Sequence, residues 1–166
     1  MPRLLEDYQT GKLFSTNKFP NLRKLGLYYN SSFKWPTLRS LSDLQTLKII
    51  FMPESEVNQD NFGLHGGILN SDIMKLLVGG FQKVLVFQMR GLNCKNWMLE
   101  SGAMPHLQNL VIHNCKMLKM LPDEVWSLGN LQEVKVLWPS KELADTLGKL
   151  KMKDGCKLSL LNIDLS

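Results

Sequence analysis

The 166-residue sequence predicts an α/β solenoid, a fold in which short coils stack side by side and share one core. Two observations predict it. Apolar residues recur at a spacing that fits neither a helix nor a strand for long. Segments of the chain also resemble one another: LSDLQTLKI (41–49) resembles LGNLQEVKV (128–136), and FPNLRKLGL (19–27) resembles MPHLQNLVI (104–112). Such self-similarity is typical of a repeat array.

The clearest coil lies within Met104–Trp138 and follows L-x-x-L-x-L-x-x-(N/C)-x-x-L, the leucine-rich-repeat signature. Because side chains alternate along a strand, Leu110 and Ile112 should enter the core while their neighbours face out. Cys115 marks the turn after the strand, at the position that Asn30 takes in an earlier coil, where an asparagine can bond unpaired backbone groups. The template positions of this coil are Leu107, Leu110, Ile112, Cys115, Leu118 and Leu121.

The same template predicts one leucine-rich-repeat domain over residues 1–166, with about six repeats. A curved parallel sheet should form the concave side, and turns and short helices the convex side. Inward strand positions are expected at 25, 47, 87, 110 and 134, followed by 158 and 160 in a last strand. At 81–92 we place Val84, Phe87, Met89 and Leu92 on the template, and a register with Val84 and Val86 in the strand remains the alternative.

Three segments depart from the regular coils. Residues 1–18 resemble a partial N-terminal repeat, as in a chain cut from a longer array, and 139–166 a C-terminal repeat or cap that ends the array naturally. Residues 53–80 are read as an inserted polar loop and a helix that starts near Ser71 and stops at Gly79. The inward positions of this helix would be Ile73, Leu76 and Leu77. A second short helix is expected near the C-terminus, and its inward positions would be Leu143, Leu147 and Leu150.

Composition and charge exclude several classes of protein. The formal net charge of +5 comes without a block of Lys and Arg, so we expect no nucleic-acid partner. The N-terminal residues lack the pattern of a signal peptide, and no apolar run approaches the roughly 20 residues of a membrane span. Three widely spaced cysteines suit a reducing compartment, so we expect a cytoplasmic protein.

No group of residues predicts catalysis or metal binding. His113 and Cys115 are suitable zinc ligands by type, but His113 should face outward and Cys115 inward, and too few other histidines are available for a closed four-ligand site. A Cys–His nucleophile needs both side chains to converge in a cleft. We therefore expect no enzyme, no metal and no cofactor. A metalloprotein or enzyme that uses Cys115 is the rival reading from another class.

The side chains between and beside the inward strand positions should line the concave face, where solenoids bind partners. This set is basic with apolar patches, which favours an acidic protein surface as its partner. Its members are Lys24, Tyr28, Lys48, Ile50, Gln88, Arg90, Val111, His113, Lys135 and Leu137.

The order of coils also resembles one family. FQKVLVFQMRGLNCKNW, then ESGA, then MPHLQNLVIHNCKMLKMLPDEVWSLGNLQEVKV resembles the C-terminal leucine-rich repeats of plant nucleotide-binding immune receptors of the coiled-coil type (NLR proteins). The resemblance implies the sensor and autoinhibitory end of a disease-resistance receptor. Its partner would be a pathogen effector, a guarded host protein, or the receptor's own nucleotide-binding domain. The chain itself departs from the family, because GLHGGI lacks the Gly-Lys-Ser/Thr end of a P-loop. A generic intracellular repeat adaptor unrelated to immunity is the alternative.

Overall fold

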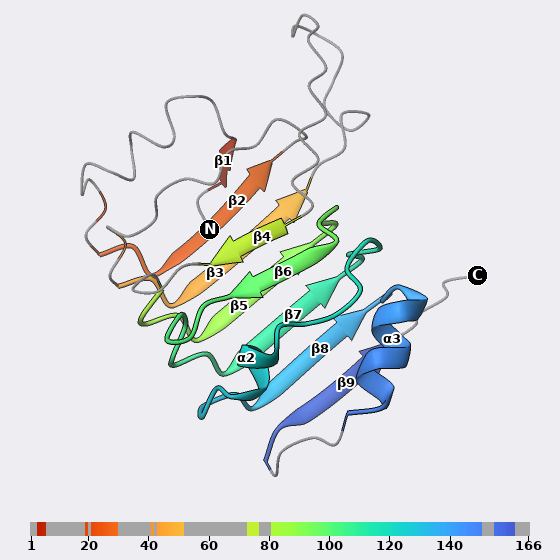
Figure 1. Ribbon diagram of the computed structural model, residues 1–166. Coiled ribbons are helices and arrows are strands. Elements are labelled where there is room, and N and C mark those ends of the chain that lie inside the picture. The colour runs from red at the N-terminus through yellow and green to blue at the C-terminus, as the bar shows by residue number, and fades with distance from the viewer. Residues whose placement is uncertain are drawn as a thin grey trace, which may run out of the picture.

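In the computed structural model, which describes residues 3–5, 19, 21–29, 41, 43–51, 73–76, 81–150 and 155–161, seven strands form one parallel sheet. Their order is β1-β2-β3-β5-β7-β8-β9, so each strand lies beside the next coil's strand (Figure 1). The strands are β1 (Arg3–Leu5), β2 (Lys24–Tyr29), β3 (Thr46–Phe51), β5 (Val86–Arg90), β7 (Asn109–His113), β8 (Glu133–Leu137) and β9 (Lys157–Leu161). The leucine-rich-repeat solenoid predicted from the sequence is confirmed. The number of repeats stays a prediction.

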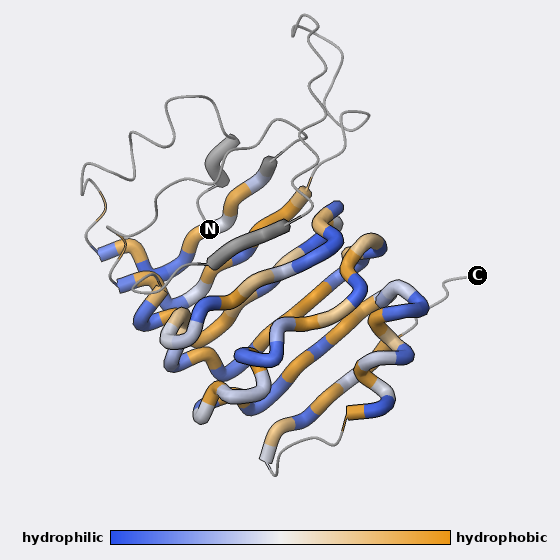
Figure 2. The backbone as a smooth tube through the Cα atoms, viewed as in Figure 1, coloured by the Kyte–Doolittle hydropathy of each residue, from blue (hydrophilic) through white to orange (hydrophobic). Residues whose placement is uncertain are grey.

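The strands pair in a single register, and this register builds the core. The inward residues form two continuous rows, and the positions that alternate with them along each strand are a mixture of polar and apolar residues (Figure 2). Phe87 is fully buried whereas Val86 is only half-buried, so the template register chosen for 81–92 is confirmed over its alternative. The rows are Leu25, Leu47, Phe87, Leu110, Val134 and Leu158, and Leu27, Ile49, Met89, Ile112, Val136 and Leu160.

Five of the described strands are entered by the same turn. The N–H of Leu107 donates to the carbonyl of Met104 at 3.0 Å, and the equivalent bonds occur before β2, β3, β5 and β8. Next to four of these turns, one carbonyl accepts two N–H groups from the following coil; the oxygen of Leu85 accepts from Gln108 at 2.9 Å and Asn109 at 3.0 Å. Buried backbone groups are thereby paired between coils as well as within the sheet.

In the part of the chain that the structure describes, three coils leave their strands through a residue in the left-handed region. Gly91, Asn114 and Trp138 follow β5, β7 and β8 with φ of 69°, 53° and 49°. Each donates its N–H to the carbonyl that ends the next strand, as Gly91 does to His113 at 2.9 Å. Glycine and asparagine accept this conformation readily, whereas a bulky residue such as Trp138 adopts it at a cost.

The covered side of the sheet carries β4 (Ile73–Leu76), β6 (Asn96–Leu99), α2 (Asp123–Trp126) and α3 (Lys141–Gly148), as Figure 1 shows. Strands β4 and β6 form a separate parallel pair, with Ile73 opposite Asn96 and Leu76 opposite Leu99. The helix predicted at Ile73 and Leu76 is therefore wrong. A short apolar run fits either a helix or a strand, and pairing with β6 decides for the strand here. The polar loop predicted before it, like Asn30, lies outside the described residues.

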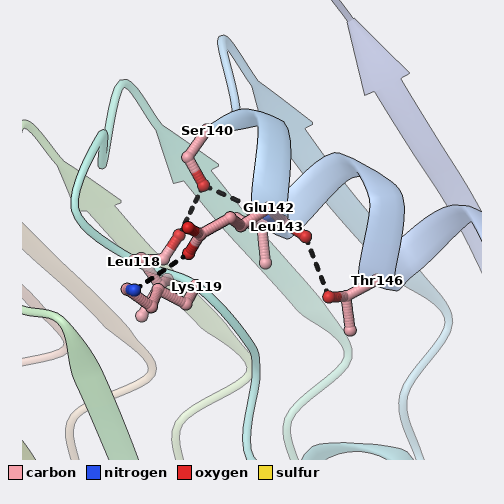
Figure 3. Close-up of polar contacts among 6 residues, drawn as sticks. All are labelled: Leu118, Lys119, Ser140, Glu142, Leu143 and Thr146. Carbon is pink, nitrogen blue, oxygen red and sulfur yellow. Dashed lines mark hydrogen bonds and ion pairs between the residues drawn. The ribbon is translucent and has the colours of Figure 1, made fainter.

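Helix α3 is joined to the preceding coil by its N-terminal cap. The hydroxyl of Ser140 donates to the carbonyl of Leu118 at 2.7 Å and accepts the N–H of Leu143 at 3.1 Å (Figure 3). Beside it, the ammonium group of Lys119 and the carboxylate of Glu142 form an exposed ion pair at 3.1 Å. The cap satisfies one of the helix's first N–H groups and at the same time fixes the helix against the neighbouring coil.

The last coil is less buried than the sequence predicts. Leu143 and Leu147 lie in the core as expected, but Leu150 follows the end of α3 and is 38% exposed. Leu158 and Leu160 hold the predicted register, yet Leu158 is half-buried and Leu160 is 38% exposed. Among the described strands β9 pairs with β8 alone, so its inward side chains are packed from one side.

We predict that Gly91→Ala lowers the free energy of unfolding by about 1–2 kcal/mol, because an added Cβ is disfavoured at a φ of 69°. Gly148→Ala is the matched control. Gly148 lies in α3, and no atom lies within 4 Å of the position that the Cβ of an alanine would take, so alanine should raise stability there by about 0.5–1 kcal/mol. Urea unfolding of both variants measures the difference. Equal effects would contradict a requirement for the left-handed conformation.

We also predict that Ser140→Ala lowers the free energy of unfolding by about 1 kcal/mol, since both hydrogen bonds of the cap are lost. Ser140→Thr keeps the hydroxyl and should stay close to the parent protein. Thermal unfolding followed by circular dichroism compares the two variants. A threonine variant as unstable as the alanine variant would show that packing, rather than the cap, accounts for the loss.

Candidate functional site

We call the sheet face opposite α2, α3, β4 and β6 the open face. The side chains that alternate with the core residues line it, and the strand register places them in three rows. The first row is Lys24, Thr46, Val86, Asn109, Glu133 and Lys157; the second is Gly26, Lys48, Gln88, Val111, Lys135 and Ser159; the third is Tyr28, Ile50, Arg90, His113, Leu137 and Leu161.

All ten residues that the sequence assigns to partner binding lie on the open face. Lys24 belongs to the first row, and the other nine belong to the second and third rows. Arg90 and Lys24 are exposed, Ile50 is 9% exposed, and the remaining members are half-buried. Their role in binding a partner stays a prediction.

The positive charge of the open face is unevenly compensated. Glu133 is the single carboxylate in the three rows, and it forms an ion pair with Lys135 at 3.1 Å. Lys48 and Arg90, on β3 and β5, have no carboxylate partner among the described residues. Lys24 and Lys157, in the first row, likewise have none there, so uncompensated positive charge extends along the face and includes its centre.

His113 lies at this centre. It is paired in register with Arg90, and its ring makes an edge-on contact with Trp138, with centroids 4.6 Å apart and planes at 81°. Burial lowers the pKa of His113, and the positive charges of Arg90 and Lys48 lower it further. Within the described part of the chain its Nδ1 atom has no hydrogen-bond partner, so the protonated ring lacks an acceptor there.

The sequence did not point to Trp138 as part of this site. Trp138 directly follows the last open-face residue of β8, and its left-handed backbone turns the chain next to His113. The available signal was positional. Trp138 occupies the place that Gly91 and Asn114 take after their strands, so the template marks it as the residue beside the end of the open face.

Two of the three cysteines, Cys94 and Cys115, lie in the hydrophobic core. Cys115 is 1% exposed, as expected for its template position, and its thiol donates to the carbonyl of His113 at 3.6 Å. Burial raises the pKa of Cys115 to about 12 and that of Cys94 to about 11. Both thiols therefore stay protonated near neutral pH, where the thiolate is the nucleophile. Across the described residues no cluster of three or more His, Cys, Asp or Glu side chains has the arrangement of a metal site.

We predict that His113 makes the protein less stable as the pH falls. Because its pKa is lowered in the folded state, the unfolded chain binds the proton more readily, and stability should drop as the pH decreases through about 6.5. Above that pH range His113 is neutral in both the folded and the unfolded state, so it no longer makes stability depend on pH. His113→Gln should flatten the pH dependence of the urea midpoint between about pH 7 and 5, and Arg90→Gln should flatten it partly. A slope unchanged in His113→Gln would contradict this assignment.

Comparison with known proteins places these features in context. The chain is 34% identical over 70 residues to disease resistance protein RPP8 of Arabidopsis thaliana. The matched segment covers 42% of this chain and 8% of that protein. It is 25% identical over 132 residues to the late blight resistance protein homolog R1B-16 of Solanum demissum, covering 75% of this chain and 9% of that protein. No family model matches the chain.

The chain thus spans less than a tenth of the length of these curated relatives. In the described residues, none of the helices has the length and apolar character needed to cross a membrane. Taken with the confirmed repeat fold, the comparisons make this chain similar, over part of its length, to plant disease resistance proteins.

Proposed function

We propose that this chain is the leucine-rich-repeat region of a plant intracellular immune receptor of the coiled-coil, nucleotide-binding type, and that it binds a protein without catalysing a reaction. The similarity to RPP8 and to R1B-16 is the observation that carries the proposal. In such a receptor the switch driven by nucleotide would belong to the remaining length of the protein, and this chain would supply recognition and autoinhibition.

The open face supports recognition of a protein surface. Parallel strands lie about 4.8 Å apart, so six successive strands present an extended array of side chains on a rigid support. Its described members include Tyr28 and Arg90, and tyrosine and arginine are the residue types that most often dominate binding energy. Because the core rows are shared between coils, the binding residues can vary without disturbing the fold.

Charge supports an acidic partner. Lys48 and Arg90 lack carboxylate partners within the described region, while the acidic Glu133 is already paired with Lys135. A surface with complementary negative charge would associate faster and in one preferred orientation. The partner would be a pathogen effector, a guarded host protein, or the nucleotide-binding domain of the same receptor.

A cytoplasmic location and a role without catalysis complete the proposal. The three cysteines are free thiols, which agrees with a reducing compartment. Cys94 and Cys115 are buried with raised pKa values, which disfavours nucleophilic chemistry.

The test is capture of partners from plant leaf extract by the immobilised chain. The triple variant Tyr28→Ala/Arg90→Ala/His113→Ala should retain about one tenth or less of the amount of captured protein that the parent chain retains. A tenfold reduction corresponds to a loss of about 1.4 kcal/mol of binding energy. Quantitative mass spectrometry compares it with the parent chain.

The matched control is Lys116→Ala/Met120→Ala/Lys149→Ala, which changes three exposed residues away from the open face. This control should capture as much as the parent. The proposal fails if the two triple variants lose capture equally, or if the parent chain captures nothing beyond the bare support.

A further inference from the structure

Three cationic or ionisable side chains lie on the adjacent strands β3, β5 and β7 at the centre of the open face, and we call them the Lys48–Arg90–His113 cluster. Arg90 and His113 are direct register partners on β5 and β7. Lys48 lies on β3, one outward position before Ile50, which is the partner of Arg90. Strands are spaced at about 4.8 Å, and the charges of both Lys48 and Arg90 act on His113, so the three groups form one electrostatic unit.

Ion pairs elsewhere in the described residues show what this cluster lacks. Lys83 pairs with Asp43 at 2.6 Å, Lys119 with Glu142 at 3.1 Å, and Lys135 with Glu133 at 3.1 Å. Neither Lys48 nor Arg90 has such a partner in the part of the chain that the structure describes. Like charges held this close oppose folding, and a negative group from outside the chain would relieve the repulsion.

Apolar side chains flank the cluster on both sides. Along the third row the order is Ile50, Arg90, His113 and Leu137, so an apolar residue lies on each side of the two nitrogen-bearing groups. The ring of Trp138 adds an aromatic surface against His113 at 4.6 Å between centroids. A ligand that matches this row carries negative charge at its centre and apolar groups beside it, with most apolar contact toward Leu137 and Trp138 because Ile50 is only 9% exposed.

We propose that the Lys48–Arg90–His113 cluster is the docking subsite for an acidic polypeptide segment, with an Asp or Glu between apolar residues, and that docking is coupled to proton uptake by His113. This inference rests on the proposed function and specifies the chemistry of its partner. The apolar flanks and the paired Glu133 on the same face favour a polypeptide over a nucleic acid, which would bring a continuous line of phosphates.

Proton uptake follows from the charges around the ring. Arg90 on β5 and Lys48 on β3 disfavour the imidazolium form. On β8 the charged groups are Lys135 and Glu133, which compensate each other. A docked carboxylate would offset Arg90 and Lys48, so the bound state would hold the proton at a higher pH than the free state. Linkage then requires affinity to rise as the pH falls, as long as the partner's carboxylate stays ionised.

The experiment uses the full chain and a blocked peptide of alternating leucine and glutamate, with a matched peptide of alternating leucine and glutamine. Binding is followed by NMR shifts of the His113 ring and by calorimetry at pH 6 and pH 8. We expect the glutamate peptide to shift the His113 and Trp138 signals and to bind several-fold more tightly at pH 6. The parent chain alone thus tests the proposal, whether or not a variant folds.

Two variants sharpen the result. His113→Gln should bind the glutamate peptide with equal affinity at both pH values, because the proton-binding group is gone. Lys119→Gln changes a lysine outside the open face and should retain the pH ratio of the parent. The proposal is overturned if the glutamine peptide binds as well as the glutamate peptide, if the pH ratio survives His113→Gln, or if a single-stranded oligonucleotide displaces the peptide by binding more tightly.

Failure here is distinct from failure of the proposed function. If the open-face triple variant loses a captured plant protein while the glutamate peptide leaves the His113 signals unchanged, recognition by the open face stands and the acidic subsite is rejected. If neither experiment detects binding, both are rejected.

Discussion

In-register pairing between parallel strands is the constraint on which the rest of this protein depends. Side chains alternate between the two faces of a sheet, so a slip of one residue would exchange every core residue with an outward one. Hydrogen bonds between the turns also help to fix this register. At Leu85, for example, the carbonyl accepts two N–H groups from the next coil. The same constraint that stacks Phe87 on Leu110 therefore also places Arg90 beside His113.

The core and its register could be predicted because their signal is local and repeated. Leu110 and Ile112 fix the strand of one coil, and the equivalent spacing identifies the others without knowledge of their contacts. Where a side chain's environment depends on a distant segment, the sequence was insufficient. Ile73–Leu76 is a strand because β6 lies beside it, and Leu160 is exposed because the described sheet ends at β9.

The candidate site, too, could be predicted from the sequence only in part. Its ten residues were identifiable from alternation alone, since each lies between or beside inward positions on a strand. Which of their charges remain uncompensated is a property of the folded chain. Lys83 and Lys119 find carboxylates in other coils, far away in sequence, whereas Lys48 and Arg90 find none among the described residues. The contact between His113 and Trp138 likewise depends on a backbone turn that apolar periodicity does not encode.

The change of covering layer along the array has a mechanical consequence. Strands β4 and β6 are paired, so they lie about 4.8 Å apart, which is also the spacing of the strands in the sheet that they cover. The two layers therefore have the same spacing per coil there. A helix such as α3 is about 10 Å across and needs more room than one strand step. The array should therefore bend more strongly around β8 and β9 than around β3 and β5. A partner that spans both ends would have to follow a surface whose radius shortens toward the last coil.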